Sequence, residues 1–319
     1  MTHPSAFSNL VHPIRIATPF AVGDVFSYLL TDDKIVLIDC GHHSPSAFET
    51  VRSNLADHGL QINDIDEIWL THGHPDHFGQ AGHIARESGA VVYGHPKERA
   101  NFAGNADQQL FQDFFDSHHI PSHFSEKMVQ QLDWLQQFQL PIEPRWIEDE
   151  QTLTSGRLTV KVKLTPGHAP GHLIFDTQEG LIFGGDLLLE HISTNALINF
   201  DPQTGRRNKG LLQYRKSLQW MAHRQGTVLP GHGDIIHNIA EVAHHHLQEH
   251  ESRYQSIQRL LERQPMTLLE ISRELFADAI DEGAIFLVLS EVLGYLDWGE
   301  REHTIRKESS AEAIIYHKI

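Results

Sequence analysis

Seven side chains of the kinds that bind divalent metals stand in four short segments of this sequence. The segments are THGHPDH, GHAPGH, FGGD and LPGHG, in that order along the chain. The side chains are His72, His74, Asp76, His77, His168, Asp186 and His232. Neutral imidazole and carboxylate are the ligands that Zn²⁺ and comparable first-row ions prefer. Because four of these ligands fall between residues 72 and 77, the pattern predicts two adjacent ions.

A site of this kind predicts hydrolysis. Two ions roughly 3.5–4 Å apart can share a bridging hydroxide, formed near neutral pH, that attacks a polarised carbonyl or phosphoryl centre. We expect Asp186 to bridge the ions, and Asp76 and Asp186 to act as the catalytic carboxylates that position the hydroxide. A thiolate leaves without being protonated, so a site without an obvious protein acid favours thioesters among carbonyl substrates.

The elements that must position these ligands read as strands. KIVLID (34–39) is a short apolar run rich in β-branched residues, which indicates a buried strand ending at Asp39. LTVKVKL (158–164) alternates apolar and polar residues, and residues 173–186 read as a hairpin that ends at Asp186. TVLPGHG (227–233) is a further short strand. Because each strand end delivers a possible ligand, we expect distant segments to meet on one rim of a strand framework.

Composition is typical of a folded protein and argues against some partners. The chain has 319 residues, 40% hydrophobic and 21% charged, and a net charge of -17. Binding to phosphate backbones or anionic lipid rests on clustered Lys and Arg, so this charge opposes nucleic acid and membrane surfaces. From the residue pattern we expect neither a signal peptide nor a membrane span, and the single cysteine, Cys40, fits a reducing compartment. We therefore expect a cytoplasmic protein with a small-molecule substrate.

Helical patterns divide the chain into a main part and two additions. We predict a catalytic domain over residues 1–250, with a helical insertion at about 96–150, and a smaller domain over 251–319. Within the insertion, Phe111, Phe114 and Phe115 have the i, i+3, i+4 spacing of ordinary core packing. A lid over the substrate is the alternative, because the insertion lies between two segments that supply metal ligands.

The metal motifs, over roughly residues 12–245, resemble the metallo-β-lactamase superfamily, in particular its glyoxalase II-like and β-lactamase-like members. The resemblance implies an αββα sandwich with the site at one edge. It implies that His72, His74 and His168 hold one metal, that Asp76, His77 and His232 hold the other, and that Asp186 bridges them. Asp39 and His172 would lie behind the ligands, where Asp39 orients a ligand histidine. The ions would be zinc, with iron or manganese as alternatives.

Departures from the family patterns narrow the activity. True β-lactamases of this superfamily usually lack the second-site Asp-His pair and the bridging aspartate, both of which are present here. Lactonases commonly carry a tyrosine three residues after the bridging aspartate, where this chain has Leu189. The resemblance therefore implies a thioesterase or esterase before a lactonase. A metal-dependent endoribonuclease or phosphodiesterase, a mononuclear iron sulfur dioxygenase, and a non-enzymatic binding module with a vestigial site remain as rivals.

The tail, about residues 255–319, resembles the winged-helix domain appended to some members of the superfamily. A winged helix invites a nucleic-acid interpretation. Residues 274–300, however, contain no Lys or Arg and seven acids, which would repel phosphate. Apolar residues from Ile285 to Leu296 predict instead that this helix is buried against the main domain or another subunit, which leaves a homodimer open.

Overall fold

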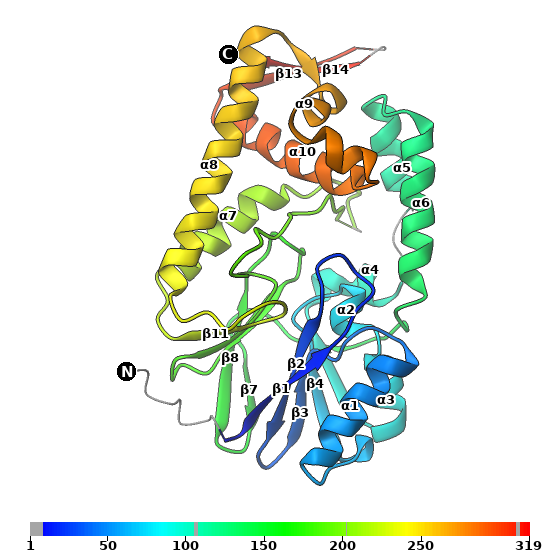
Figure 1. The fold of residues 1–319 in the computed structure, drawn as a ribbon, viewed down its shortest axis with the longest axis vertical. Coiled ribbons are helices and arrows are strands. Elements are labelled where there is room, and N and C mark those ends of the chain that lie inside the picture. Colours follow the sequence, from blue (N-terminus) through cyan, green and yellow to red (C-terminus); the bar gives the residue numbers. More distant parts are fainter. Residues whose placement is uncertain (1–8, 105–107, 202, 311–312) are drawn as a thin grey trace.

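Two facing sheets form the centre of this computed structural model, which describes residues 9–104, 108–201, 203–310 and 313–319 (Figure 1). The first sheet has the strand order β1-β2-β3-β4-β5-β6. Its strands are β1 (Val11–Ile16), β2 (Val25–Thr31), β3 (Ile35–Ile38), β4 (Ile65–Trp69), β5 (Val91–Gly94) and β6 (Arg145–Trp146). The pairs from β3 to β6 are parallel, so their carboxyl ends lie along the same edge.

The second sheet has the order β11-β10-β9-β8-β7. Its strands are β7 (Thr152–Ser155), β8 (Leu158–Leu164), β9 (Leu173–Asp176), β10 (Leu181–Gly185) and β11 (Thr227–Pro230). The first four run antiparallel and β11 joins β10 in parallel. β10 and β11 therefore also end side by side, and each is followed directly by a predicted ligand segment.

Alternation along the strands explains the layers. In β4, Ile68 packs beneath the first sheet with helices α1 (Pro45–Asp57) and α3 (Ala81–Ser88), whereas Trp69 points between the sheets. In β9, Phe175 points between the sheets and Ile174 joins the outer layer, which includes α7 (Gly210–Met221) and α8 (Ile239–Arg263). Both sheets are thus covered on both faces, as their short apolar strands indicate. The predicted αββα sandwich is confirmed.

The insertion forms a helical arm whose longer helices stand alongside the C-terminal helices (Figure 1). It contains η2 (Pro96–Glu98), α4 (Arg99–Phe102), α5 (Gln108–Ser117) and α6 (Ser122–Gln136). Phe114 and Phe115 are buried in the same cluster as residues of the C-terminal helices, while Phe111 is partly buried against it. Ordinary core packing therefore accounts for two of the three phenylalanines.

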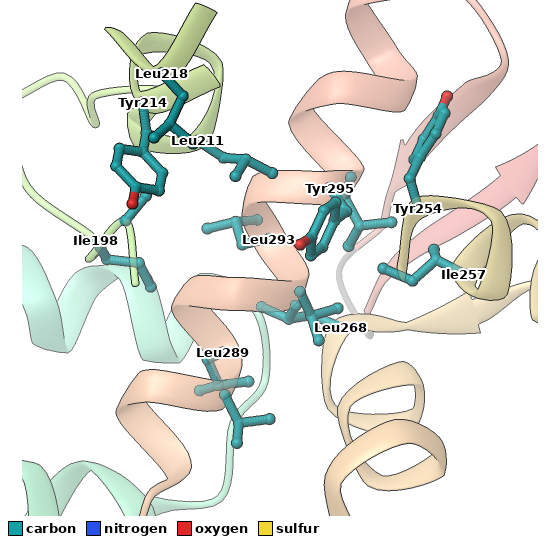
Figure 2. Packing of buried hydrophobic residues seen from close by; sticks show 14 of the residues in the cluster. Ile198, Leu211, Tyr214, Leu218, Tyr254, Ile257, Leu268, Leu289, Leu293 and Tyr295 are labelled. Carbon is teal, nitrogen blue, oxygen red and sulfur yellow. The ribbon is translucent and has the colours of Figure 1, made fainter. Parts of the chain in front are cut away.

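The C-terminal region packs against the main part of the chain. It comprises α9 (Leu268–Asp281), α10 (Ile285–Arg301) and a small sheet of β12 (Met266–Thr267), β14 (Ile314–Lys318) and β13 (Ile305–Ser309). Figure 2 shows Leu293 of α10 near Leu211 of α7, and Tyr295 toward the α8 side. The predicted boundary at residue 250 falls inside α8. The division into two domains and the winged-helix type stay predictions.

Two acidic residues of α10 have partners that the sequence did not reveal. Asp297 accepts two hydrogen bonds from the guanidinium of Arg207, at 2.7 and 2.6 Å. Glu291 pairs with Arg253 on α8. These acids therefore hold α10 to the rest of the chain. In the part of the chain that the structure describes, no helix combines the length and apolar character needed to cross a bilayer.

Candidate metal centre

All seven predicted ligands meet at one end of the sandwich, where the strands deliver them. His72 follows β4, and His74, Asp76 and His77 lie at or within the short helix α2 (Pro75–Phe78). The other three ligands follow β8, β10 and β11 and are His168, Asp186 and His232. Their ligand atoms form three overlapping groups, each within 4.8 Å: His72, His74 and His168; His72, His77 and Asp186; and Asp76, His77 and His232.

The first group consists of three imidazoles. Nε2 of His72 lies 3.0 Å from Nδ1 of His74, and Nε2 of His168 lies 2.9 Å from the same atom. Burial lowers the pKa of His74 to about 4 and that of His168 to about 3. These side chains are therefore neutral at pH 7, the form in which an imidazole binds a metal.

The group of Asp76, His77 and His232, called the second group from here on, mixes imidazole and carboxylate. Nε2 of His232 lies 3.3 Å from Oδ2 of Asp76. Burial opposes protonation of His77, yet the neighbouring carboxylates of Asp186, Asp39 and Asp76 raise its pKa well above the ordinary value. Without a metal, these carboxylates therefore retain protons on the histidines around them. A divalent cation can balance the negative charge of these carboxylates in place of the protons.

Asp186 lies between the two groups. Its Oδ1 is 3.3 Å from Nε2 of His77, and its Oδ2 is 3.5 Å from Nε2 of His168 and 3.6 Å from Nε2 of His232. Gly231 makes this approach possible, because a Cβ there would lie 2.4 Å from Oδ1 of Asp186. The position of the carboxylate supports the bridging role predicted for it.

Hydrogen bonds at the opposite ring nitrogens turn three histidines toward the centre. Nδ1 of His168 lies 3.0 Å from the carbonyl oxygen of Asn195, and Nδ1 of His232 lies 2.7 Å from that of Asp24. A carbonyl can only accept, so both Nδ1 atoms carry the proton. Nδ1 of His77 is likewise held by Asp39, at 2.8 Å. In the neutral form of each ring, the Nε2 lone pair then points into the site, as metal-binding histidines require.

Asp39 also supports the first group. Oδ2 of Asp39 accepts the hydroxyl proton of Thr71 at 2.8 Å, and Nδ1 of His72 lies 2.9 Å from that hydroxyl oxygen. The sequence predicted an orienting role for Asp39 toward a ligand histidine, and this geometry supports it for two. Thr71 was not predicted, although it stands directly beside His72.

His172 lies behind Asp186. Its Nε2 accepts a hydrogen bond from the backbone N–H of Asp186 at 3.0 Å, and its Nδ1 lies 2.9 Å from the hydroxyl of Thr165. His172 is fully buried and is in none of the three ligand groups. The arrangement supports the prediction that His172 positions a ligand.

A buried carboxylate that the sequence did not single out joins two of the ligand loops. Glu98, in η2, is fully buried. Its Oε2 accepts from the backbone N–H of Gly73 at 3.1 Å and the amide of Asn101 at 2.7 Å, and its Oε1 accepts from the N–H of Gly171 at 2.6 Å. Gly73 lies between His72 and His74, and Gly171 directly precedes His172. Glu98 therefore fixes the spacing between the two loops.

The residues present fit a pair of divalent ions. Among the described residues, Nε2 of His77, Oδ1 of Asp186 and Nε2 of His232 are buried without a hydrogen-bond partner. Buried polar atoms without partners are costly, and here all three point into the same centre. An imidazole and carboxylate donor set of this kind is suited to zinc and comparable first-row ions.

The comparisons with known proteins agree with this geometry. Residues 21–232 match the family model of the metallo-beta-lactamase superfamily. The chain is 30% identical over 309 residues to the probable metallo-hydrolase YqjP of Bacillus subtilis, covering 92% of each protein. It is 27% identical over 239 residues to thioesterase pkgB of Emericella nidulans, covering 74% of this chain and 53% of that protein.

A solved structure shows the same fold over nearly the whole chain. The metallo-beta-lactamase family protein of Thermus thermophilus superposes with a TM-score of 0.83 at 24% identity, covering 98% of this chain and 99% of that one. The match includes the C-terminal region as well as the sandwich. The family match, the relative at 30% identity and the clustered histidines and aspartates show that this chain is a metallo-hydrolase that belongs to the metallo-beta-lactamase superfamily.

Proposed function

We propose that this protein is a dinuclear metal-dependent hydrolase that acts on thioesters or esters. The observation that carries the proposal is the position of Asp186 between two ligand groups, each of which supplies enough donors for an ion of its own. His72, His74 and His168 would hold one ion, and Asp76, His77 and His232 the other. Zinc is the expected metal, with iron or manganese as alternatives that metal analysis distinguishes.

Residues of the chain then position the groups that react. When bound, divalent ions lower the pKa of a coordinated water and polarise a carbonyl oxygen. The carboxylates of Asp76 and Asp186 can accept hydrogen bonds from an attacking water and so fix its direction. Asp39 and Glu98 keep the ligand loops in place. A rigid arrangement of this kind lowers the reorganisation needed in the transition state.

The lack of a proton donor at position 189 favours a substrate with a thiolate leaving group, which is a thioester. Leu189, three residues after Asp186, is buried, and its carbonyl oxygen lies 2.7 Å from Nε2 of the buried His246. This position therefore offers no side-chain acid to a leaving oxygen. A thiolate needs none, whereas an alkoxide does. The similarity to a relative named as a thioesterase, at 27% identity, supports the same substrate class.

The cysteine content supports a reducing compartment, because a single cysteine cannot form a disulfide within the chain. The single cysteine, Cys40, is buried and burial raises its pKa well above the ordinary value, so it is an unreactive thiol. We propose a cytoplasmic protein that acts on a small molecule. The net charge of -17 opposes nucleic acid as a substrate.

A substrate panel tests the proposal. The purified protein would be analysed for zinc, iron and manganese and then assayed with thioesters, oxygen esters, lactones, a phosphodiester and RNA. We expect hydrolysis of thioesters and a loss of at least about 10³-fold in kcat/KM for Asp186→Asn. Asp278→Asn, on the exposed face of α9, is the matched control and should retain activity. Cleavage of RNA alone would replace the proposal with a nuclease function, and one iron per chain would favour a mononuclear oxygenase.

A further inference from the structure

A cavity of about 930 Å³ opens beside the first ligand group. Gly73, His74 and Pro75 form one part of its wall, and His74 also supplies Nδ1 to the ligand cluster. The cavity therefore borders the metal centre at His74. The volume falls in the range typical of sites that enclose whole small molecules.

Three separate parts of the chain build the other walls. The insertion contributes α4, α5 and α6, the loop at residues 197–200 contributes a second wall, and Phe286 and Leu287 of α10 contribute a third. In Figure 1, α5 and α6 stand alongside α10. The C-terminal region thus forms part of the cavity wall.

The loop and α10 are fixed to each other and to the metal centre. The amide of Asn195 donates to the carbonyl oxygen of Leu287 at 2.8 Å, and the carbonyl oxygen of Asn195 holds Nδ1 of His168. The N–H of Ile198 donates to the hydroxyl of Ser290 at 3.1 Å. Two of the cavity walls are therefore held in fixed positions relative to each other and to the metal centre.

The lining is mainly apolar. Its larger apolar side chains include Phe111, Met128, Leu132, Ile198, Phe200 and Phe286. Apart from His74, the charged or titratable residues among those lining it are Arg99 and Glu143, which pair at 3.2 Å. The guanidinium of Arg99 also stacks over Trp146, at 4.5 Å from the ring centroid. Among the described lining residues, the permanently charged cation is Arg99, which is paired with Glu143.

We propose that this cavity binds the apolar acyl group of the substrate, so that the enzyme prefers medium-chain or bulky apolar acyl thioesters over short or anionic ones. The expected preference in hydrolysis rests on the proposed function, whereas the binding of an apolar group in the cavity does not. A substrate carbonyl held beside His74 has within reach of its acyl group the space that Leu132 and Phe286 line. Each methylene that enters this space leaves water, which strengthens binding about threefold to fourfold.

Chain-length series test the preference. Acetyl, butyryl, octanoyl and decanoyl thioesters of one small thiol would be compared by release of that thiol. We expect kcat/KM for the decanoyl thioester to exceed that for the acetyl thioester by roughly tenfold or more. A second series would keep the acetyl group and lengthen the thiol. If activity follows the length of the thiol and not of the acyl group, the assignment to the acyl group is overturned.

A pair of tryptophan variants on α6 locates the effect. Leu132→Trp places a larger side chain in the cavity and should lower the decanoyl-to-acetyl ratio of kcat/KM by about tenfold. Gln130→Trp, an exposed residue on the same helix, is the matched control and should leave the ratio unchanged. Circular dichroism and thermal unfolding of both variants would show that each remains folded.

A binding assay separates this inference from the proposed reaction. N-phenyl-1-naphthylamine, a neutral apolar fluorophore, would be titrated into the full-length metal-free protein and displaced with decanamide. We expect saturable binding that Leu132→Trp weakens at least fivefold and Gln130→Trp does not. If no thioester is hydrolysed while this binding pattern holds, the proposed function fails and the apolar cavity stands. Equal binding by both variants, or equal hydrolysis of acetyl and decanoyl thioesters, refutes the inference.

Discussion

Nδ1 of His77 donates a hydrogen bond of 2.8 Å to Oδ2 of Asp39. The same oxygen accepts the hydroxyl of Thr71, which in turn holds Nδ1 of His72. One carboxylate therefore orients a histidine in each of the two ligand groups. Asp39 adopts a left-handed backbone conformation with φ of 53°, so the chain accepts some local strain to bring this side chain under the site.

Replacing Asp39 with Asn tests this relationship. Asparagine tolerates left-handed backbone, so the change removes the charge and one acceptor with little effect on the turn. We expect affinity for the ion at the second group to fall about 10- to 100-fold. Competition with a chromophoric chelator would measure it. The control is Asp33→Asn, an exposed aspartate shortly before Asp39 in the chain, which should leave metal affinity unchanged.

Replacing Glu98 with Gln tests the connection between the two ligand loops. The three atoms that contact the Glu98 carboxylate are all hydrogen-bond donors, so the amide nitrogen of glutamine must face one of them. The least disruptive orientation keeps Gly73 and Asn101 and loses Gly171. We expect weaker zinc binding and a free energy of unfolding lower by about 1–3 kcal/mol. The exposed Glu87→Gln is the control, and an unaltered zinc affinity in Glu98→Gln would contradict the role.

The difference between Asp39 and Glu98 shows what the sequence could reveal. The ligands of residues 72–77 are close in sequence and carry recognisable donor types, so the metal centre could be predicted. Glu98 acts on the N–H of Gly171, 73 residues away, and His168 is held by a backbone carbonyl of Asn195. Backbone donors and acceptors exist at every residue, so such contacts have no sequence signature.

The same limit applies to the fold. The buried strands and the αββα arrangement follow from short apolar runs. β1, however, was not predicted, because VHPIRI contains Pro13 and shows no clear alternation. Proline is tolerated there because β1 lies at the edge of its sheet. The acidic residues of α10 indicated repulsion of nucleic acid, but their partners Arg207 and Arg253 lie far away in sequence.

Asp297 should be important for stability. Its carboxylate is 2% exposed and is paired with both terminal nitrogens of Arg207. Asp297→Ala leaves a partly buried guanidinium without its partner, which typically costs about 3–5 kcal/mol. Urea unfolding would measure the loss. Asp281→Ala, at the exposed end of α9, is the control, and similar stability in the two variants would show that the pair contributes little.

Removing the metal should destabilise the protein without unfolding it. The sandwich has its own apolar core, whereas the ligand cluster concentrates carboxylates and imidazoles that a cation stabilises. Zinc at a hundred times its dissociation constant adds about 2.7 kcal/mol, which raises the Tm of a chain of this length by about 4 °C. Differential scanning calorimetry with and without a chelator would detect the shift. Asp186→Asn should show a smaller increase, and an equal increase would indicate that Asp186 does not hold the metal.

Stability of the metal-free protein should fall in mild acid because of histidines outside the metal centre. Burial lowers the pKa of His250 to about 3, and its Nε2 lies 3.0 Å from the hydroxyl of Ser193. An unfolded histidine titrates near pH 6.5. The contribution of His250 to the free energy of unfolding is therefore complete above pH 6.5. It is lost as the pH falls toward 3, because His250 takes up a proton in the unfolded chain before it does so in the folded protein. Each such group contributes a slope of about 1.4 kcal/mol per pH unit.

The comparison of His250→Gln with the original chain isolates this slope. Urea unfolding at pH 7, 6 and 5 would give the free energy of unfolding for each protein. We expect the difference between them to shrink by about 1.4 kcal/mol per pH unit below pH 6.5, because glutamine does not titrate. His244→Gln, exposed on the same helix, is the matched control. A difference that stays constant from pH 7 to 5 would mean that His250 takes up its proton equally well in the folded protein, in which case its burial does not exclude the charged form.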